Sequence, residues 1–196
     1  MNEVEVKVLG IDIEQIREKL EKIGATLIKK EFQKNYMFDF ADQRFFNSGG
    51  YVRIRNLIDL LMNQEKNIVT HKELISKDKF KISKEIEFTS NNLDSTKFFL
   101  EALGLKLLRI DEKYRESYKL PEGLIEIDTW AGVPSYLEAE SETESGVINL
   151  LTRLGYSLEQ STSMSLAEIL KYYHLDNSNR IFSDEEKEII LNQAKK

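Results

Sequence analysis

Apolar and charged residues alternate along much of this chain. In the opening segment, Val4 and Val6 separate Glu3, Glu5 and Lys7. Successive side chains of a strand point to opposite sides of a sheet, so this spacing predicts a strand with one charged and one apolar face. We expect seven further strands, many with the same alternation, at about 27–40, 51–55, 68–74, 80–89, 106–120, 124–130 and 135–142.

Other segments carry apolar residues at helical spacing. Residues 12–24 do so, with Asp12 as a suitable N-cap. We expect further helices at about 92–103, 146–154 and 165–173, and one from residue 184, where Ser183 and Glu186 form a capping box. A loop is expected over 41–50, which ends in two glycines. Strands that mostly follow one another through short turns predict an α+β fold with a largely antiparallel sheet.

Length and composition limit the choice of protein class. The 196 residues contain no proline- or glycine-rich linker, so we expect one domain over 1–175 and a helical tail over 176–196. No apolar run is long enough to cross a bilayer, and we expect no membrane partner. The absence of cysteine excludes disulfides and thiolate metal sites, and the cytoplasm is the expected location. A net charge of -6 argues against general nucleic-acid binding.

The charges of the expected strands are sorted by sign. Some strands carry acids at alternating positions, such as Glu138 and Glu140, and others carry bases, such as Arg53 and Arg55. One interpretation is a sheet with a solvated charged face. The other is a closed eight-stranded barrel with helices outside and charges inside. Buried charges are costly unless they are paired. A polyphosphate would supply partners for the bases. A divalent cation such as Mg²⁺ or Mn²⁺ would supply a partner for the acids.

Six charged motifs occur in an order that is typical of one family. They are Glu3-Val4-Glu5-Val6-Lys7, Gly50-Tyr51-Val52-Arg53-Ile54-Arg55, Thr70-His71-Lys72, Lys84-Glu85-Ile86-Glu87, Lys113-Tyr114-Arg115, and the segment from Ile127-Asp128 to Glu138-Ala139-Glu140. Together they resemble the CYTH group of triphosphate tunnel metalloenzymes, which includes class IV adenylyl cyclases, thiamine triphosphatases and inorganic tripolyphosphatases. The resemblance runs from residue 3 to about residue 170.

The resemblance implies a closed, largely antiparallel eight-stranded tunnel that holds a triphosphate with Mg²⁺ or Mn²⁺. It implies catalytic roles for Glu3, Glu5 and Lys7. The implied substrate-binding residues are Lys7, Arg53, Arg55, Lys72, Lys81, Lys113 and Arg115. The implied metal ligands are Glu3, Glu5, Glu85, Glu87, Asp128, Glu138 and Glu140.

Three features depart from the family pattern. Ser83 stands where the family often has an arginine, and Lys81 or Lys84 is the expected substitute. Asn35 stands where an aspartate is common in the second strand. The segment 56–67, between two expected strands, is longer than the resemblance implies.

The resemblance implies an enzyme whose substrate is a small-molecule triphosphate, namely tripolyphosphate, thiamine triphosphate or ATP. Attack by water would make it a triphosphatase, which is the outcome that we expect. Attack by the ribose 3′-oxygen of ATP would make it a class IV-type adenylyl cyclase. The best-known cyclases carry a His-Phe pair shortly before the first motif, whereas this chain begins two residues before Glu3. A non-catalytic nucleotide- or polyphosphate-binding module is the third alternative.

The tail carries apolar residues on a charged helix, at positions 189–191. Such residues need a surface to cover them. We expect the tail to pack across the domain or onto the second subunit of a homodimer.

Overall fold

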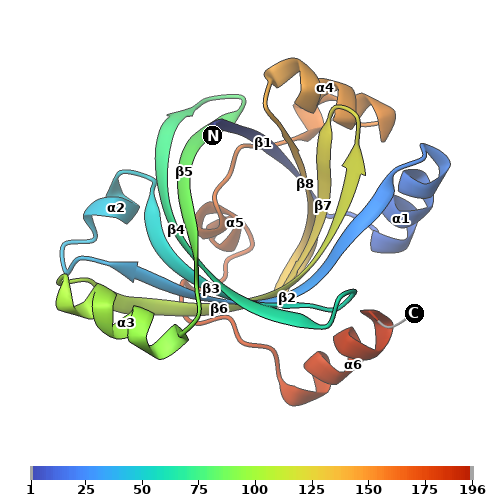
Figure 1. The fold of residues 1–196 in the computed structure, drawn as a ribbon. Helices are drawn as coiled ribbons and strands as arrows, with labels where there is room; N and C mark the ends of the chain where they lie inside the picture. Colours follow the sequence, from blue (N-terminus) through green and yellow to red (C-terminus); the bar gives the residue numbers. More distant parts are fainter. Residues whose placement is uncertain (1, 195–196) are drawn as a thin grey trace.

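The fold is described from a computed structural model, which places residues 2–194 and the side chains of residues 4–192. In these residues, eight strands close into an antiparallel barrel in the order β1-β5-β4-β3-β2-β6-β7-β8 (Figure 1). The strands are β1 (Asn2–Leu9), β2 (Thr26–Asp39), β3 (Tyr51–Asp59), β4 (Gln64–Lys77), β5 (Lys81–Ser90), β6 (Lys106–Leu120), β7 (Gly123–Trp130) and β8 (Val133–Ser141). The predicted closed barrel is confirmed.

The helices lie outside the barrel or beside its ends (Figure 1). They are α1 (Ile13–Lys22), α2 (Arg44–Asn47), α3 (Leu93–Ala102), α4 (Glu144–Arg153), η1 (Leu158–Gln160), α5 (Leu166–Tyr172) and α6 (Asp184–Ala194). The predicted caps form: Asp12 accepts a hydrogen bond from the Gln15 amide, and Ser183 and Glu186 accept from each other's backbone N–H groups. Among the placed residues, no helix is long and apolar enough to cross a membrane.

Two segments between the predicted strands contain more regular structure than the sequence indicated. The segment 56–67 is strand for most of its length, because β3 continues to Asp59 and β4 begins at Gln64. The carboxylate of Asp59 accepts hydrogen bonds from the Leu61 and Met62 amides, which turns the chain tightly. The segment 41–50 contains α2, whose first turn is fixed by the carboxylate of Asp39 beneath it.

The hydrophobic core lies between the outer face of the barrel and the helices. Ile16 and Leu20 of α1 belong to one buried cluster with Val6 of β1 and Leu150 of α4. A second cluster joins Leu100 of α3 to the outer faces of β2, β3 and β4. Burying these apolar side chains under helices leaves the charged side chains of the same strands on the inside.

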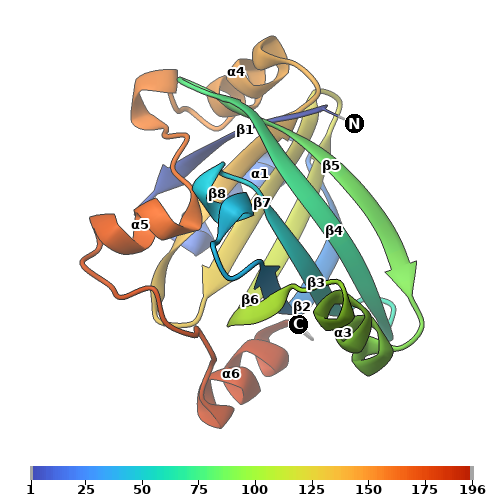
Figure 2. The ribbon, with the colours of Figure 1, turned by 90° about the vertical axis from the view of Figure 1, so that its left-hand side faces the viewer.

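One end of the barrel is covered by α5. Figure 2 shows this helix at the end opposite the start of β1. Ile169 and Leu170 pack there against Trp130 and Tyr136. The chain just before α5 is paired to β1, because Lys7 and Thr162 exchange two backbone hydrogen bonds of 2.8 Å.

The chain between α5 and α6 runs along β6, and we call residues 177–182 the strap. The Glu112 amide donates to the Arg180 carbonyl at 2.6 Å, and the Arg180 amide donates to the Ile110 carbonyl at 3.0 Å. The ring of Phe182 is buried and lies 5.9 Å from that of Phe32. β7 pairs with β6 only from Lys113 onward. The strap therefore bonds to the part of the β6 edge before Lys113, which β7 does not cover.

Candidate active site inside the barrel

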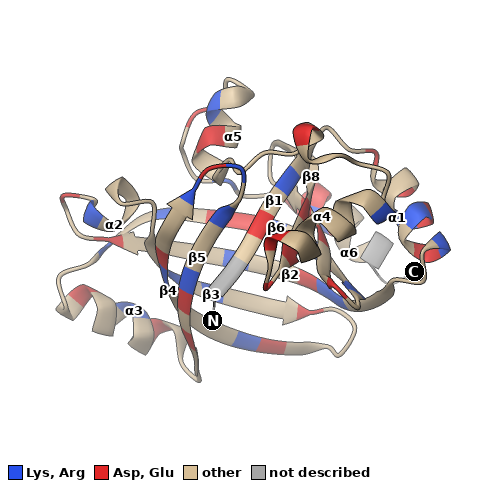
Figure 3. Cartoon of the chain, turned by 90° about the horizontal axis from the view of Figure 1, so that it is seen from above, with Lys and Arg blue, Asp and Glu red and all other residues tan. Residues whose placement is uncertain are grey.

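Charged side chains from every strand lie on the inward side of the barrel, and Figure 3 shows both signs along the same strands. The pairing registers place Lys7 opposite Glu138 and Arg115 opposite Asp128. The side chain of Glu3 lies outside the described part of the chain, so its predicted role stays a prediction. The described inward set is Glu5, Lys7, Glu31, Arg53, Arg55, Lys72, Lys81, Glu85, Glu87, Lys113, Arg115, Glu126, Asp128, Glu138 and Glu140.

Glu5 is the centre of a lysine cluster. Its carboxylate oxygens lie 2.7 Å from the Lys81 ammonium, 3.1 Å from Lys7 and 3.9 Å from Lys72. Burial alone would raise the pKa of Glu5, but these three lysines together hold it well below the ordinary value. Lys81 therefore faces the site, whereas Lys84 is exposed and lies on the other side of its strand.

Arg115 is the centre of a carboxylate cluster. Its Nε lies 2.5 Å from Asp128 Oδ1, and its Nη atoms contact Glu126 and Glu138. Lys113 Nζ lies 2.8 Å from Asp128 Oδ2. Burial would raise the pKa of Asp128, but Arg115 and Lys113 lower it well below its usual range. Burial, together with repulsion from Arg115, lowers the pKa of Lys113 to about 8.

Lys7 links the two clusters. Its ammonium lies 3.1 Å from Glu5 Oε1 and 2.8 Å from Glu138 Oε1. Burial would lower the pKa of Lys7, but Glu138 and Glu5 raise it above the ordinary value, so the ammonium stays charged. The predicted residues of β1, β6, β7 and β8 thus form one continuous network.

The two arginines of β3 are much less well paired. Arg53 Nη2 lies 3.4 Å from Thr70 Oγ1 and 4.0 Å from Glu87 Oε1. Arg55 makes no hydrogen bond or ion pair with any residue that the structure describes, and its Nε is buried. Burial, with repulsion from Arg53 and Arg115, lowers the pKa of Arg55 to about 10. Arg55 is only partly buried, but a cation among like charges is still costly, and a bound anion would relieve that cost.

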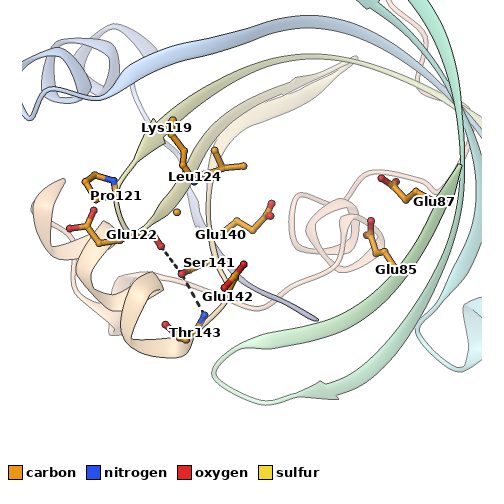
Figure 4. Close-up of a pocket in the computed structure, with 11 residues that line it drawn as sticks. Glu85, Glu87, Lys119, Pro121, Glu122, Leu124, Glu140, Ser141, Glu142 and Thr143 are labelled. Carbon is orange, nitrogen blue, oxygen red and sulfur yellow. Dashed lines mark hydrogen bonds between the residues drawn. The ribbon is translucent and has the colours of Figure 1, made fainter. Parts of the chain in front are cut away.

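The open end of the barrel has an acidic cavity of about 750 Å³. Figure 4 shows Glu85 and Glu87 of β5 on one side of the cavity and Glu140 of β8 on the other. Glu85 also lies 2.7 Å from the Lys72 ammonium. The predicted metal ligands therefore fall into two groups, one at this mouth and one farther inside.

Some residues of the interior received no role from the sequence. Glu126 shares a charged face with Asp128 by its spacing of two, but it was not assigned as a ligand. It is 5% exposed and accepts a hydrogen bond of 2.9 Å from Ser117. Burial raises the pKa of Glu126, although Arg115 opposes this. Glu31 and Gln33 of β2 are also buried, with Gln33 Nε2 donating to Glu31 Oε2 at 2.7 Å, and no charge alternation marks them.

The carboxylates of the interior fit a hard divalent cation in their chemistry. Within the described residues, no three acidic or histidine side chains form a ready metal site. Glu126, Asp128 and Glu138 nevertheless converge on the guanidinium of Arg115, which places one cationic group between three carboxylates. Carboxylate oxygens are the ligands that Mg²⁺ and similar ions prefer. These three carboxylates are therefore a chemically suitable donor set for such an ion.

Known proteins resemble this chain in sequence and in fold. The CYTH domain model matches residues 1–173. A protein of Methanocaldococcus jannaschii named "putative adenylate cyclase" is 29% identical over 182 residues, which are 92% of this chain and 94% of that protein. The structure of a "putative adenylate cyclase" from Vibrio parahaemolyticus has a TM-score of 0.72 at 17% identity, covering 86% of this chain and 97% of its own.

The description of a second solved structure names an activity. It is a protein from Hippeastrum described as a "putative adenylyl cyclase" that reveals a dominant triphosphatase activity. It has a TM-score of 0.59 at 17% identity and covers 97% of this chain and 95% of its own. At such identities the two structures show a shared fold.

Proposed function

The chain belongs to the CYTH domain family, and on this premise we propose that it is a divalent-metal-dependent enzyme that hydrolyses a triphosphate inside its barrel. The observation that carries the proposal is Arg55, a cation without a hydrogen-bond or ion-pair partner among the described residues, beside the loosely paired Arg53. A polyanion that enters the barrel supplies the missing countercharge. The substrate is tripolyphosphate or an organic triphosphate.

The bases of the interior hold the phosphate oxygens. Charge-assisted hydrogen bonds from guanidinium and ammonium groups to phosphate are short and strong. Arg55 and Arg53 offer the least encumbered donors, while the other bases exchange carboxylate partners for phosphate oxygens. The proposed substrate-binding set is Lys7, Arg53, Arg55, Lys72, Lys81, Lys113 and Arg115.

The carboxylates now paired with these bases would hold the metal ion. Glu126, Asp128 and Glu138 all contact Arg115, and Lys7 links Glu138 to Glu5. Glu85, Glu87 and Glu140 are proposed ligands at the mouth, and Glu3 is added from the sequence alone. A bound Mg²⁺ or Mn²⁺ ion would neutralise phosphate charge. Catalysis then consists mainly of positioning and charge stabilisation, as phosphoryl transfer requires.

A second candidate is adenylyl cyclisation, which the names of the M. jannaschii and V. parahaemolyticus proteins favour. In that reaction the ribose 3′-oxygen of ATP attacks the α-phosphorus and pyrophosphate leaves. We rank hydrolysis first because it needs only water as the nucleophile. The description of the Hippeastrum protein also names triphosphatase activity as dominant in a protein called a cyclase.

The test is an assay of the full chain with tripolyphosphate, thiamine triphosphate and ATP, each with Mg²⁺, with Mn²⁺ and with a chelator. Metal-dependent phosphate release is the expected result. Cyclic AMP with pyrophosphate would establish the cyclase instead. Metal-dependent binding without any product would establish a non-catalytic module. The cytoplasmic location and the homodimer stay predictions of the sequence.

A further inference from the structure

One row of side chains across the inside of the barrel has a short residue between two long charged ones. The pairing registers place Arg53 of β3 opposite Thr70 of β4, and Thr70 opposite Glu87 of β5. Thr70 is fully buried, and its hydroxyl donates to Glu87 Oε1 at 2.6 Å. The same oxygen accepts a hydrogen bond of 3.4 Å from Arg53 Nη2. The hydroxyl of Thr70 therefore lies between a guanidinium and a carboxylate.

The neighbouring row contains opposite charges with no hydroxyl between them. There Lys72 of β4 lies opposite Glu85 of β5, and its ammonium pairs directly with that carboxylate at 2.7 Å. In the row of Thr70, the nearest charged atoms of Arg53 and Glu87 are 4.0 Å apart. The attraction between two charges weakens as their separation grows. The carboxylate of Glu87 is thus bound to the hydroxyl and only loosely paired with the arginine.

Arg53 keeps unused hydrogen-bond donors as a result. It is 8% exposed, and its Nε has no hydrogen-bond partner among the described residues. Its guanidinium lies 5.2 Å from the centre of the Tyr51 ring, a contact that helps to hold the cation in place. The other end of the row is open to a ligand, because Glu87 lines the acidic cavity (Figure 4). A guanidinium that is held without a close carboxylate can donate two hydrogen bonds to a phosphate.

We propose that Thr70 is a positioning residue for phosphate binding, which keeps Glu87 from forming a direct ion pair with Arg53. The inference rests on the proposed function, since Arg53 is taken to bind a phosphate of the substrate. A direct ion pair would have to be broken before the phosphate could bind. The long hydrogen bond from Arg53 to Thr70 is weak and is easily exchanged for a phosphate oxygen. Thr70 acts on the substrate only through its two neighbours.

The experiment measures the Kd of tripolyphosphate for the full chain by calorimetry. A chelator is present, so that metal binding by Glu87 does not enter the result. Thr70→Val keeps the shape of the side chain and removes the hydroxyl. We expect the Kd to rise about tenfold, because the new ion pair competes with the phosphate. Thr70→Ser keeps the hydroxyl and should stay within about twofold of wild type. The matched control is Thr129→Val, opposite Tyr114 on the outer side of the barrel, where the hydroxyl contacts Ser135; it should also stay within about twofold.

A double variant distinguishes this role from a purely structural one. In the Glu87→Gln background, no carboxylate remains to pair with Arg53. Adding Thr70→Val should then change the Kd by less than about twofold. A rise of about tenfold in both backgrounds would show a structural defect and overturn the proposal. An unchanged Kd in the single Thr70→Val variant would overturn it as well, since Glu87 would then not compete for the arginine.

Failure of the proposed function gives a different result. If the wild-type chain binds tripolyphosphate but does not hydrolyse it, the proposed hydrolysis fails, and the Kd values still test Thr70. If binding requires Mg²⁺, KM at saturating Mg²⁺ replaces the Kd, with the same expected ratios and a smaller change in kcat. A wild-type chain that binds tripolyphosphate neither with the chelator nor with Mg²⁺ would overturn the proposed function and the role of Thr70 together.

Discussion

The inner surface of the barrel has two regions that differ in how their polar groups are satisfied. In the first, which we call the paired wall, β1 and β5 to β8 match acids with bases, as Lys7 does with Glu138. In the second, the unpaired wall, β2 and β3 carry Arg55 and Asn35 without partners among the described residues. Both walls arise from the same alternation of inward and outward side chains.

The difference between the two walls indicates where a bound ligand would gain the most binding free energy. On the paired wall, a phosphate or a metal ion must replace an existing ion pair, so binding there is an exchange. On the unpaired wall, the ligand supplies partners that the fold itself does not provide, and the cost of burying those groups is recovered. On the proposed function, the unpaired wall is therefore the part of the barrel where a ligand is bound at the expense of stability.

The largest expected effect comes from Arg55→Ala on the unpaired wall. Loss of a charge-stabilising donor should lower kcat/KM about 100- to 1,000-fold for every triphosphate. The free energy of unfolding should not fall, because the variant removes a partly buried cation that has no partner among the described residues. Steady-state kinetics and urea unfolding check the two halves of this prediction. A variant that is less stable yet fully active would contradict the division into two walls.

The next effect concerns Glu138 on the paired wall. Glu138→Gln keeps the size of the side chain but removes a charge that Lys7 and Arg115 share. If this carboxylate binds the metal, the Mg²⁺ or Mn²⁺ concentration for half-maximal activity should rise by at least about tenfold. Metal titrations at saturating substrate measure this. An unchanged titration curve would remove Glu138 from the metal site.

Glu5 gives a prediction for pH. Its pKa lies below the ordinary value of 4.5 in the folded chain, so the folded state binds its proton less readily than the unfolded state. The stabilisation is complete above pH 4.5 and is lost as the pH falls through the folded value. Glu5→Gln should therefore lower the free energy of unfolding by about 3 kcal/mol at pH 7 and by less in acid. Urea unfolding at pH 7 and below pH 4 decides this, and an equal cost at both would argue against it.

The smallest effect is expected on the outside of the barrel. Arg17 of α1 pairs with the buried Glu116, which also accepts hydrogen bonds from Tyr114 and Tyr118. Arg17→Ala should lower the unfolding free energy by about 1 kcal/mol, since its side chain is partly exposed. Activity should stay within about twofold of wild type. A large loss of activity would show that the outer surface also contributes to the site.

The sequence predicted most of the barrel because alternation is a local property. Glu3 to Lys7, Arg53 to Arg55 and Lys113 to Arg115 identify strands and faces from adjacent residues alone. The hairpin between β3 and β4 was missed because its turn depends on Asp59, whose carboxylate binds two amides just beyond it. No alternation marks such a turn.

The partners within the site were less predictable. Alternation predicts that Arg55 and Arg115 face inward. Only the register of distant strands places Arg115 opposite Asp128 and Arg55 opposite Asn35. The inward residues of β2 are mostly uncharged, so the charge pattern did not reveal them. The unpaired wall was therefore visible only after the barrel had closed.

The strap has a consequence for where this protein can be shortened. The family match ends at residue 173, so a chain cut there would keep all eight strands yet lose the residues that bond Ile110 and Glu112. It would also uncover Phe32, which Phe182 now contacts. An open strand edge beside an exposed aromatic ring is a template for association between chains. The strap thus covers a strand edge and an aromatic ring that would favour aggregation if they were exposed.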